Sequence, residues 1–340
     1  MTSRCLILFL FLLTANLTFG QVTFTVEDFS NDYVGKVYIS DTTEVFSPGW
    51  VAIFEKSSKK QIIKVESDEL SFDLHDGKLL ANIKSLPYGE QSLIIYEDFN
   101  FDGKKDFAIM DGQNSCYHGP SFQIYLATGN GFKYSEDFTQ LAQEYCGMFD
   151  VDSQAKEINV MTKDGCCWHQ YSTFIVENNK PKAIRIIEDD QTDFPFSTSS
   201  EEVWNGEKMI KTSERTIDLD EEGIQTILRF HVDKNGKDII LFNINDRTLN
   251  YVVIDKRGLV EFSYPLETVY QNPDFIFDSK KSAITFKNKN VVYKVYNESG
   301  KVGIEINIDG KIYNWIGNNQ TKQGTLNDLL KTKLDNVVIN

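Results

Sequence analysis

The sequence predicts an all-β protein whose strands are mostly antiparallel. Short runs of β-branched and aromatic residues recur along its 340 residues, which include 24 Phe and 15 Tyr. Turn sequences rich in Gly, Asn and Pro, such as residues 128–131 and 178–181, separate these runs at short intervals. Apolar residues at helical spacing occur in two places only. This combination is typical of antiparallel hairpins.

In the first half, Phe138, Leu141 and Ala142 stand at helical spacing, so one helix is expected within residues 135–145. The segment 188–206 is acidic, rich in Ser and Thr, and contains Pro195, which predicts a boundary. We therefore expect a first domain over residues 21–190, a linker over 191–206 and a second β-rich domain over 207–340. Strands are expected in the first half at 35–40, 50–55, 61–66, 91–96, 106–110, 122–127, 158–162, 171–176 and 183–187.

In the second half, hairpins are expected to recur. A short C-terminal helix is expected over residues 325–333, with Thr325 as its N-cap and Leu329 and Leu330 facing inward. No repeat of blade length is visible, so a propeller with identical blades is not expected. The expected strands are 224–232, 237–245, 292–296, 303–308 and 311–316.

Residues 1–20 predict a secretory signal. Arg4 precedes an apolar run over residues 5–13, and small residues precede Gln21, so cleavage is expected after Gly20. The run is too short to span a bilayer, and Cys5 lies ahead of it, so neither a membrane span nor a lipid anchor is expected. The mature protein should be periplasmic or secreted.

The mature chain is strongly acidic. Without Arg4, 34 basic residues remain against 50 acidic ones, a net charge of about −16. This disfavours nucleic acid as a partner, because nucleic-acid binding depends on neutralising phosphates. It favours encounter with basic proteins.

The segment from Asp98 to Asp106 places oxygen-bearing side chains at positions 1, 3, 5 and 9 of a short loop. Ca²⁺ binds six to eight oxygens, and this spacing points alternate residues toward one centre. Gly103 permits the sharp turn, and Phe99 and Phe101 should point away into a core. The expected Ca²⁺ ligands are the side chains of Asp98, Asn100, Asp102 and Asp106 and the backbone carbonyl of Lys104.

Predicted strands flank this loop on both sides. An EF-hand would instead need two helices and a Glu at position 12, where this chain has Ile109. We therefore expect a strand–loop–strand calcium site of weak affinity, as in integrin-type and related bacterial repeats. The alternative is an Asx-rich surface turn without an ion.

An even number of cysteines follows the predicted signal, which predicts disulfides with three possible pairings. We favour a Cys116–Cys146 bridge together with one between adjacent Cys166 and Cys167, and crossing bridges stay an alternative. Zinc is another alternative, because nearby His118 and His169 add nitrogen ligands to the two thiol patches. The four cysteines are Cys116, Cys146, Cys166 and Cys167.

Four stretches, LPYGEQSLIIYEDFNFDGKKDFAI, HGPSFQIYL, CGMFDVD and KDGCCWH, occur in this order. Together they resemble one bacterial family, the periplasmic calcium-binding immunity proteins that inhibit lysozyme-like peptidoglycan hydrolases delivered by antibacterial type IV secretion systems. The resemblance covers roughly residues 22–190 and leaves the second half outside. It implies a β-propeller-like N-terminal domain in which the calcium loop, residues 98–106, binds the ion.

The resemblance also implies a partner, a peptidoglycan hydrolase of basic charge. We expect the partner surface to lie beside the calcium loop, where aromatic side chains could anchor a partner's cleft. The residues expected there are Tyr117, His118, Trp168 and His169, with Cys166 and Cys167 between them.

The sequence lacks a hydrolase nucleophile elbow, a His-Glu-x-x-His motif, a phosphate loop and a dinucleotide fingerprint, so we expect a protein that is not an enzyme. Two alternatives to an inhibitor stay open. One is a structural or adhesion-type envelope module stabilised by calcium. The other is a glycan hydrolase using a carboxylate pair from Asp111, Asp150 and Asp152, with Tyr117 and Trp168 as sugar platforms.

Overall fold

The computed structural model describes residues 22–86, 89–266 and 273–340. About 58% of the chain is strand and nearly all strand pairs are antiparallel, which confirms the all-β prediction. Contacts divide the chain into two compact units. The N-terminal unit comprises residues up to 163 and 170–186, and the C-terminal unit comprises residues 164–169 and 187–340. The predicted signal peptide, residues 1–20, lies outside the described residues.

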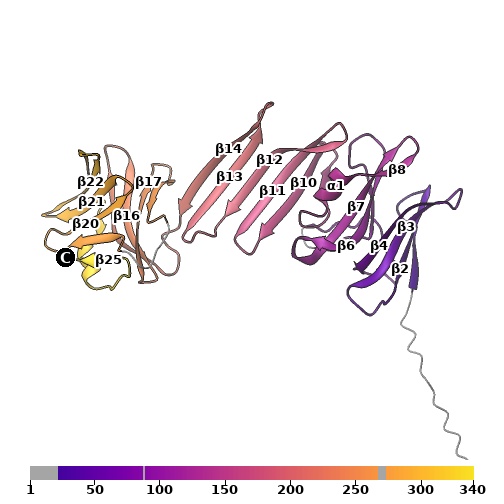
Figure 1. The fold of residues 1–340 in the computed structure, drawn as a ribbon, viewed down its shortest axis with the longest axis horizontal. Helices are drawn as coiled ribbons and strands as arrows, with labels where there is room; N and C mark the ends of the chain where they lie inside the picture. The colour runs from indigo at the N-terminus through magenta and orange to yellow at the C-terminus, as the bar shows by residue number, and fades with distance from the viewer. Residues whose placement is uncertain (1–21, 87–88, 267–272) are drawn as a thin grey trace, which may run out of the picture. The chain divides into compact units, whose positions relative to one another are not determined.

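The N-terminal unit is built from strands that follow one another as up-and-down meanders (Figure 1). The first sheet has the order β1-β2-β3-β4, the second has the order β5-β6-β7-β8, and β9 to β12 follow in a third. The strands are β1 (Val22–Val26), β2 (Tyr33–Ile39), β3 (Ser47–Glu55), β4 (Gln61–Leu70), β5 (Ile94–Glu97), β6 (Asp106–Ser115), β7 (Gly119–Thr128), β8 (Gly131–Tyr134), β9 (Asp150–Asp152), β10 (Glu157–Asp164), β11 (Trp168–Glu177) and β12 (Lys180–Asp190).

One core joins these sheets. Fully buried Phe107, Phe122 and Phe138 belong to it, with β-branched residues from all three sheets. Phe138 comes from the helix α1 (Glu136–Leu141), which is shorter than the segment 135–145 predicted for it. The chain leaves helical geometry at Ala142, whose N–H donates to the Thr139 and Gln140 carbonyls, and then enters the turn that carries the buried Cys146.

The C-terminal unit continues the pattern with a hairpin and two sheets of orders β18-β17-β16-β15-β24 and β23-β22-β21-β20-β19-β25 (Figure 1). Its core centres on Phe230, Tyr251 and Phe286. The strands are β13 (Phe196–Trp204), β14 (Met209–Ile217), β15 (Ile224–Val232), β16 (Lys237–Ile244), β17 (Thr248–Ile254), β18 (Val260–Tyr264), β19 (Phe275–Asp278), β20 (Ala283–Asn288), β21 (Val291–Glu298), β22 (Lys301–Ile308), β23 (Lys311–Ile316), β24 (Gln323–Gly324) and β25 (Val337–Ile339).

In two places the C-terminal unit differs from what the sequence predicts. Residues 191–206, expected as a linker, contain β13, which pairs along its length with β14. Pro195 stands immediately before the strand, where its missing N–H costs no ladder bond. The expected C-terminal helix is a 3₁₀ turn, η2 (Leu326–Leu330), with Thr325 accepting the Asn327 N–H as predicted. Leu329 is buried, but Leu330 is 55% exposed, because a 3₁₀ turn of this length buries a narrower face.

Candidate functional site

The predicted calcium loop connects β5 to β6, in the strand–loop–strand arrangement that the sequence predicts. Glu97 and Asp106 are direct partners in the antiparallel pair at the base of the loop. Phe99 is fully buried and packs edge-to-face on Phe149, with ring centroids 5.2 Å apart, while Phe101 is partly buried against the same core. The loop is therefore anchored by its aromatic residues, as expected.

The loop's oxygens converge on its own backbone. The N–H of Asp102 donates to Asp98 Oδ1 at 3.1 Å and to Asn100 Oδ1 at 3.2 Å, so these two oxygens lie on the same side of the turn. Gly103 has a φ angle of +87°, a backbone conformation that favours glycine. Its N–H donates to Asp98 Oδ2 at 2.8 Å. Asn100 also donates its side-chain amide to Asn179 Oδ1 at 3.2 Å, which ties the loop to the β11–β12 turn.

Asp106 occupies the last position of the loop and is fully buried. Its Oδ2 accepts the Phe99 N–H at 2.8 Å, and its Oδ1 accepts the Ala127 N–H at 2.7 Å, so it joins the loop to the end of β7. Burial raises the pKa of Asp106 to about 6, although these two N–H groups favour the ionised form. The negative charges of Asp98 and Asp102 are smaller contributions to the same rise.

The donor chemistry of the loop fits Ca²⁺. Three carboxylates, one carboxamide and a backbone carbonyl are hard oxygen donors, and an oxygen that accepts one hydrogen bond keeps a second lone pair. After burial, repulsion from Asp98 and Asp102 contributes to the raised pKa of Asp106, and a divalent cation offsets such repulsion between carboxylates. A cluster of three or more His, Cys, Asp or Glu side chains placed to hold a metal does not occur among residues 22–86, 89–266 and 273–340. Calcium binding therefore stays a prediction.

Tyr117 and His118 lie at the other end of β6. The calcium loop enters this strand at Asp106, and Ser115, ten residues on, leads into the short turn η1 (Cys116–His118). Two register shifts shorten this strand: Phe107 faces Tyr125 and Ser115 faces Gly119 on β7, so at about 3.3 Å per residue of the partner strand the two ends are about 20 Å apart. The expectation that Tyr117 and His118 lie beside the calcium loop is therefore wrong.

Tyr117 and His118 instead form an exposed surface with the β2–β3 loop, which we call the aromatic tip (Val45, Phe46, Tyr117 and His118). Phe46 packs edge-to-face on the His118 ring at 5.2 Å, and Glu69 pairs with His118 at 3.4 Å. Tyr117 is 58% exposed and Val45 is 74% exposed. Tyr117 and His118 both have positive φ angles, +53° and +57°.

Trp168 and His169, the other two expected partner residues, begin β11 and are half-buried. They belong to residues 164–169, which group with the C-terminal unit. The structure thus brings Tyr117 and His118 together on one surface and places Trp168 and His169 in the other unit.

Both favoured disulfides are present, Cys116–Cys146 and Cys166–Cys167. The pairing prediction is confirmed, and the thiols that the zinc alternative required are consumed. Two disulfides are typical of an exported protein. The described part of the chain contains no helix long and apolar enough to cross a membrane.

The carboxylates considered for glycan hydrolysis lie on two different strands. Asp111, on β6, accepts hydrogen bonds from Ser121 at 2.6 Å and from Gln143 at 2.6 Å. Asp150 and Asp152 stand on β9.

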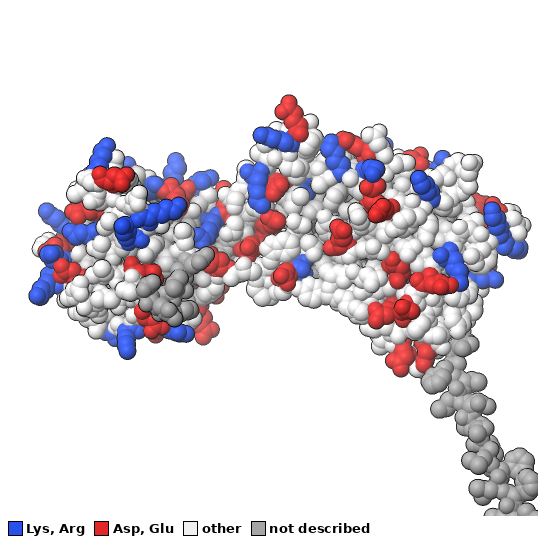
Figure 2. Space-filling model, viewed as in Figure 1, with Lys and Arg blue, Asp and Glu red and all other residues white. Residues whose placement is uncertain are grey.

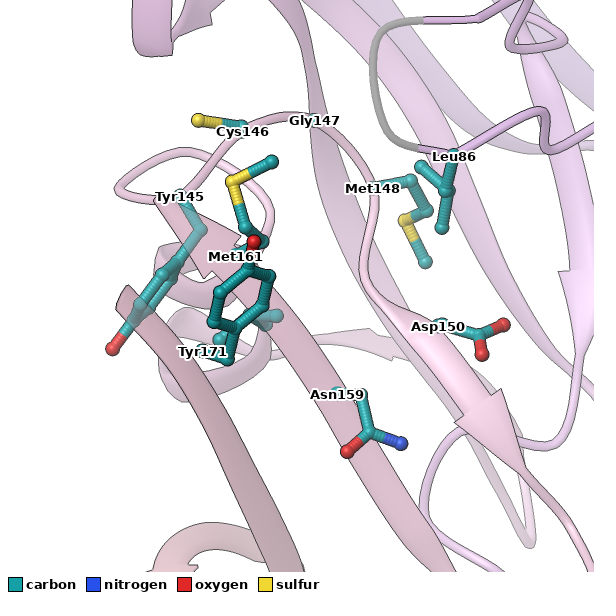
Figure 3. Close-up of a pocket in the computed structure, with 10 residues that line it drawn as sticks. Leu86, Tyr145, Cys146, Gly147, Met148, Asp150, Asn159, Met161 and Tyr171 are labelled. Carbon is teal, nitrogen blue, oxygen red and sulfur yellow. The ribbon is translucent and has the colours of Figure 1, made fainter. Parts of the chain in front are cut away.

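A pocket of about 400 Å³ opens in the N-terminal unit beside Cys146 (Figure 3). Sequence reasoning missed it, because its residues come from separate segments with no shared spacing. Tyr145, Met161 and Tyr171 lie on one side, Leu86 and Met148 on the other, and Asp150 and Asn159 toward one end.

The wall at 145–149 is held in three ways. The disulfide to Cys116 fixes Cys146, whose N–H donates to the Met161 carbonyl at 2.8 Å. Gln91 Oε1 accepts the Met148 N–H at 3.0 Å. Gly147 has φ +86°, and a Cβ there would lie 2.6 Å from the Gln91 amide. A second, smaller pocket shares Cys146 and Gly147 and reaches Tyr117.

Neither a protein-family model nor a curated protein matches the chain. Among solved structures, it is similar to a Xanthomonas type IV secretion system related protein, with 20% identity and a TM-score of 0.44 over 58% of this chain and 94% of that one. It is also similar to the β-propeller domain of the trilobed protease from Pyrococcus furiosus, with 9% identity and a TM-score of 0.25 over 86% and 97% of the two chains. TolB from Acinetobacter baumannii gives 8% identity and a TM-score of 0.17 over 84% and 80%. At these values the likenesses say nothing of activity or partners.

Proposed function

We propose that the N-terminal unit is a calcium-stapled, non-catalytic binding module that inhibits a lysozyme-like peptidoglycan hydrolase. One observation supports the calcium part of the proposal: side-chain oxygens of Asp98 and Asn100 lie on the same side of one turn. The buried Asp106 carboxylate closes this turn, and its raised pKa shows that its ionised form is destabilised there. The sequence resemblance supplies the inhibitory part of the proposal.

The aromatic tip is the surface that we assign to the partner. Its exposed Val45, Phe46 and Tyr117 offer the apolar and aromatic anchors that dominate protein interfaces. Acidic side chains are spread over the visible face of the molecule with basic ones among them (Figure 2), and the mature chain carries a net charge of about −16. Such a protein meets basic hydrolases faster at low salt.

Turbidity clearing of a cell-wall suspension tests inhibition. We expect the mature protein at micromolar concentration with calcium to slow at least one lysozyme-like hydrolase of a broad panel, and chelator or high salt to weaken the effect. Tyr117→Ala should weaken inhibition, and Tyr134→Ala, at an exposed tyrosine on β8, should not. No inhibition across the panel would refute the inhibitor role.

A structural envelope module stabilised by calcium is the second candidate. It is favoured by the separation of the calcium loop from the aromatic tip along β6, because an ion about 20 Å away would stabilise the fold rather than the partner surface. Under this alternative, calcium raises stability and no hydrolase is inhibited.

A further inference from the structure

The pocket beside Cys146 has mainly apolar walls and one charged group, the Asp150 carboxylate. Lysine and arginine are absent from its described lining residues. A pocket of about 400 Å³ is at the small end of the range for ligand sites and matches a single long side chain better than a folded element.

The polar end of the pocket is rich in hydrogen-bond acceptors. Asp150 and Asn159 are direct partners in the β9–β10 pair, so their side chains stand side by side on one face of the sheet. Asn159 Oδ1 accepts the Thr173 hydroxyl at 2.9 Å and can accept a second hydrogen bond. The Asp150 side chain is 62% exposed and therefore open to a ligand.

The nearest cation leaves most of the Asp150 charge available. Lys84 Nζ lies 4.0 Å from Asp150 Oδ1 but only 2.6 Å from Glu97 Oε2, so Lys84 pairs chiefly with Glu97. The field at this end of the pocket is therefore negative, which favours a cationic hydrogen-bond donor.

The walls suit an aliphatic stem that ends in a planar cation. Met148 and Met161 are polarisable and adapt to the shape of an occupant. The rings of Tyr145 and Tyr171 add apolar surface for the stem. The planar fork of a guanidinium can donate to two acceptors at once, which suits Asp150 and Asn159 better than an ammonium does. A sugar would need donors and acceptors around its ring, and two polar side chains at one end do not provide them.

We infer that this pocket receives an arginine side chain from a basic protein partner. The inference rests on the proposed function, because it names the feature of the inhibited protein that this unit would recognise. The stem would lie between the methionine and tyrosine walls, and the guanidinium would donate to Asp150 and Asn159.

The test uses small probes and methionine methyl resonances, with n-butylguanidinium as the arginine mimic and n-butylurea as its neutral isostere. On the wild type, we expect saturable shifts of the Met148 and Met161 methyl signals and about fivefold tighter binding of butylguanidinium. Asp150→Asn should bring the ratio of the two affinities near one. Asp152→Asn, the same change on the same strand outside the pocket, should keep the wild-type ratio.

Equal affinity of the wild type for the two probes would overturn the assignment. The same ratio of butylguanidinium to butylurea affinity in Asp150→Asn and in Asp152→Asn would overturn it as well. Absence of shifts at both methionines would overturn it too. These results are independent of the inhibition assay. If the protein inhibits a hydrolase but does not prefer butylguanidinium, the proposed function stands and the arginine pocket is refuted. If it prefers butylguanidinium but inhibits no hydrolase, only the inhibitor role is refuted.

Discussion

Asp106 Oδ1 accepts the backbone N–H of Ala127 at 2.7 Å, which fastens the calcium loop to the end of β7. The same carboxylate accepts the Phe99 N–H through its other oxygen. A residue expected as a calcium ligand is thus also the link between the loop and its neighbouring strand.

Asp106→Ala should therefore destabilise the protein even in chelator. The change leaves the buried N–H of Phe99 and the partly buried N–H of Ala127 without their acceptor, and we expect the free energy of unfolding to fall by about 2 kcal/mol or more. Asp68→Ala, an exposed change on β4, should alter it by less than about 0.5 kcal/mol. Denaturant unfolding measures both, and equal effects would contradict the buried link.

The stability of the calcium-free protein should depend on pH through the same group. The pKa of Asp106 is raised from its ordinary 3.8 to about 6, so between these values the folded protein holds a proton that the unfolded chain has lost. Stability from this group is therefore present at low pH and is lost as pH rises through about 6, by about 3 kcal/mol at most. In chelator, wild type should lose more stability from pH 4 to pH 7 than Asp106→Asn does. Parallel curves for the two proteins would be inconsistent with this prediction.

Gly147→Ala should be destabilising. The residue has φ +86°, and its new Cβ would meet the Gln91 amide that holds Met148. We expect a loss of about 1–3 kcal/mol in the free energy of unfolding. Gly129→Ala is the control, since nothing lies within 4 Å of a Cβ there. A neutral Gly147→Ala would show that the wall of the pocket is free to move.

Intact-mass measurement shows directly whether the two disulfides are formed. Each bridge removes two hydrogens, so the exported protein should be lighter than its reduced form by about four hydrogens. Cys146→Ser should destabilise the protein by about 2–4 kcal/mol, because its bridge closes a 30-residue separation. Free thiols with stoichiometric zinc would contradict the disulfides.

Local patterns were sufficient for the anchored loop and for the strands that were expected, each of which overlaps an observed strand. They favoured the observed cysteine pairing without excluding the alternatives. Strands without a clear pattern were not expected, namely β1, β8, β9, β13, β14, β17, β18, β19, β20, β24 and β25. The position of Tyr117 and His118 was not predictable in this way. The strand expected at residues 106–110 extends to Ser115, because bulges around Gly112, at φ +143°, carry the polar stretch after Met110 into the sheet. This extension separates the calcium loop from the aromatic tip.

The pocket was beyond sequence reasoning for a different reason. Its walls come from Leu86, the turn at 145–148, and strands β10 and β11, and only tertiary packing brings them together. Asp150 was considered as a hydrolytic carboxylate because acidic residues are abundant, and its partner Asn159 carried no signal at all.

Melting of the mature protein in millimolar calcium and in chelator tests the central claim most directly. A ligand that binds only the folded state adds about 2.7 kcal/mol at a hundredfold excess over its Kd, so calcium should raise the melting temperature by several degrees. Asp102→Ala should abolish this shift, and Asp68→Ala should keep it. Identical melting of the wild type in calcium and in chelator would contradict the calcium-stapled account.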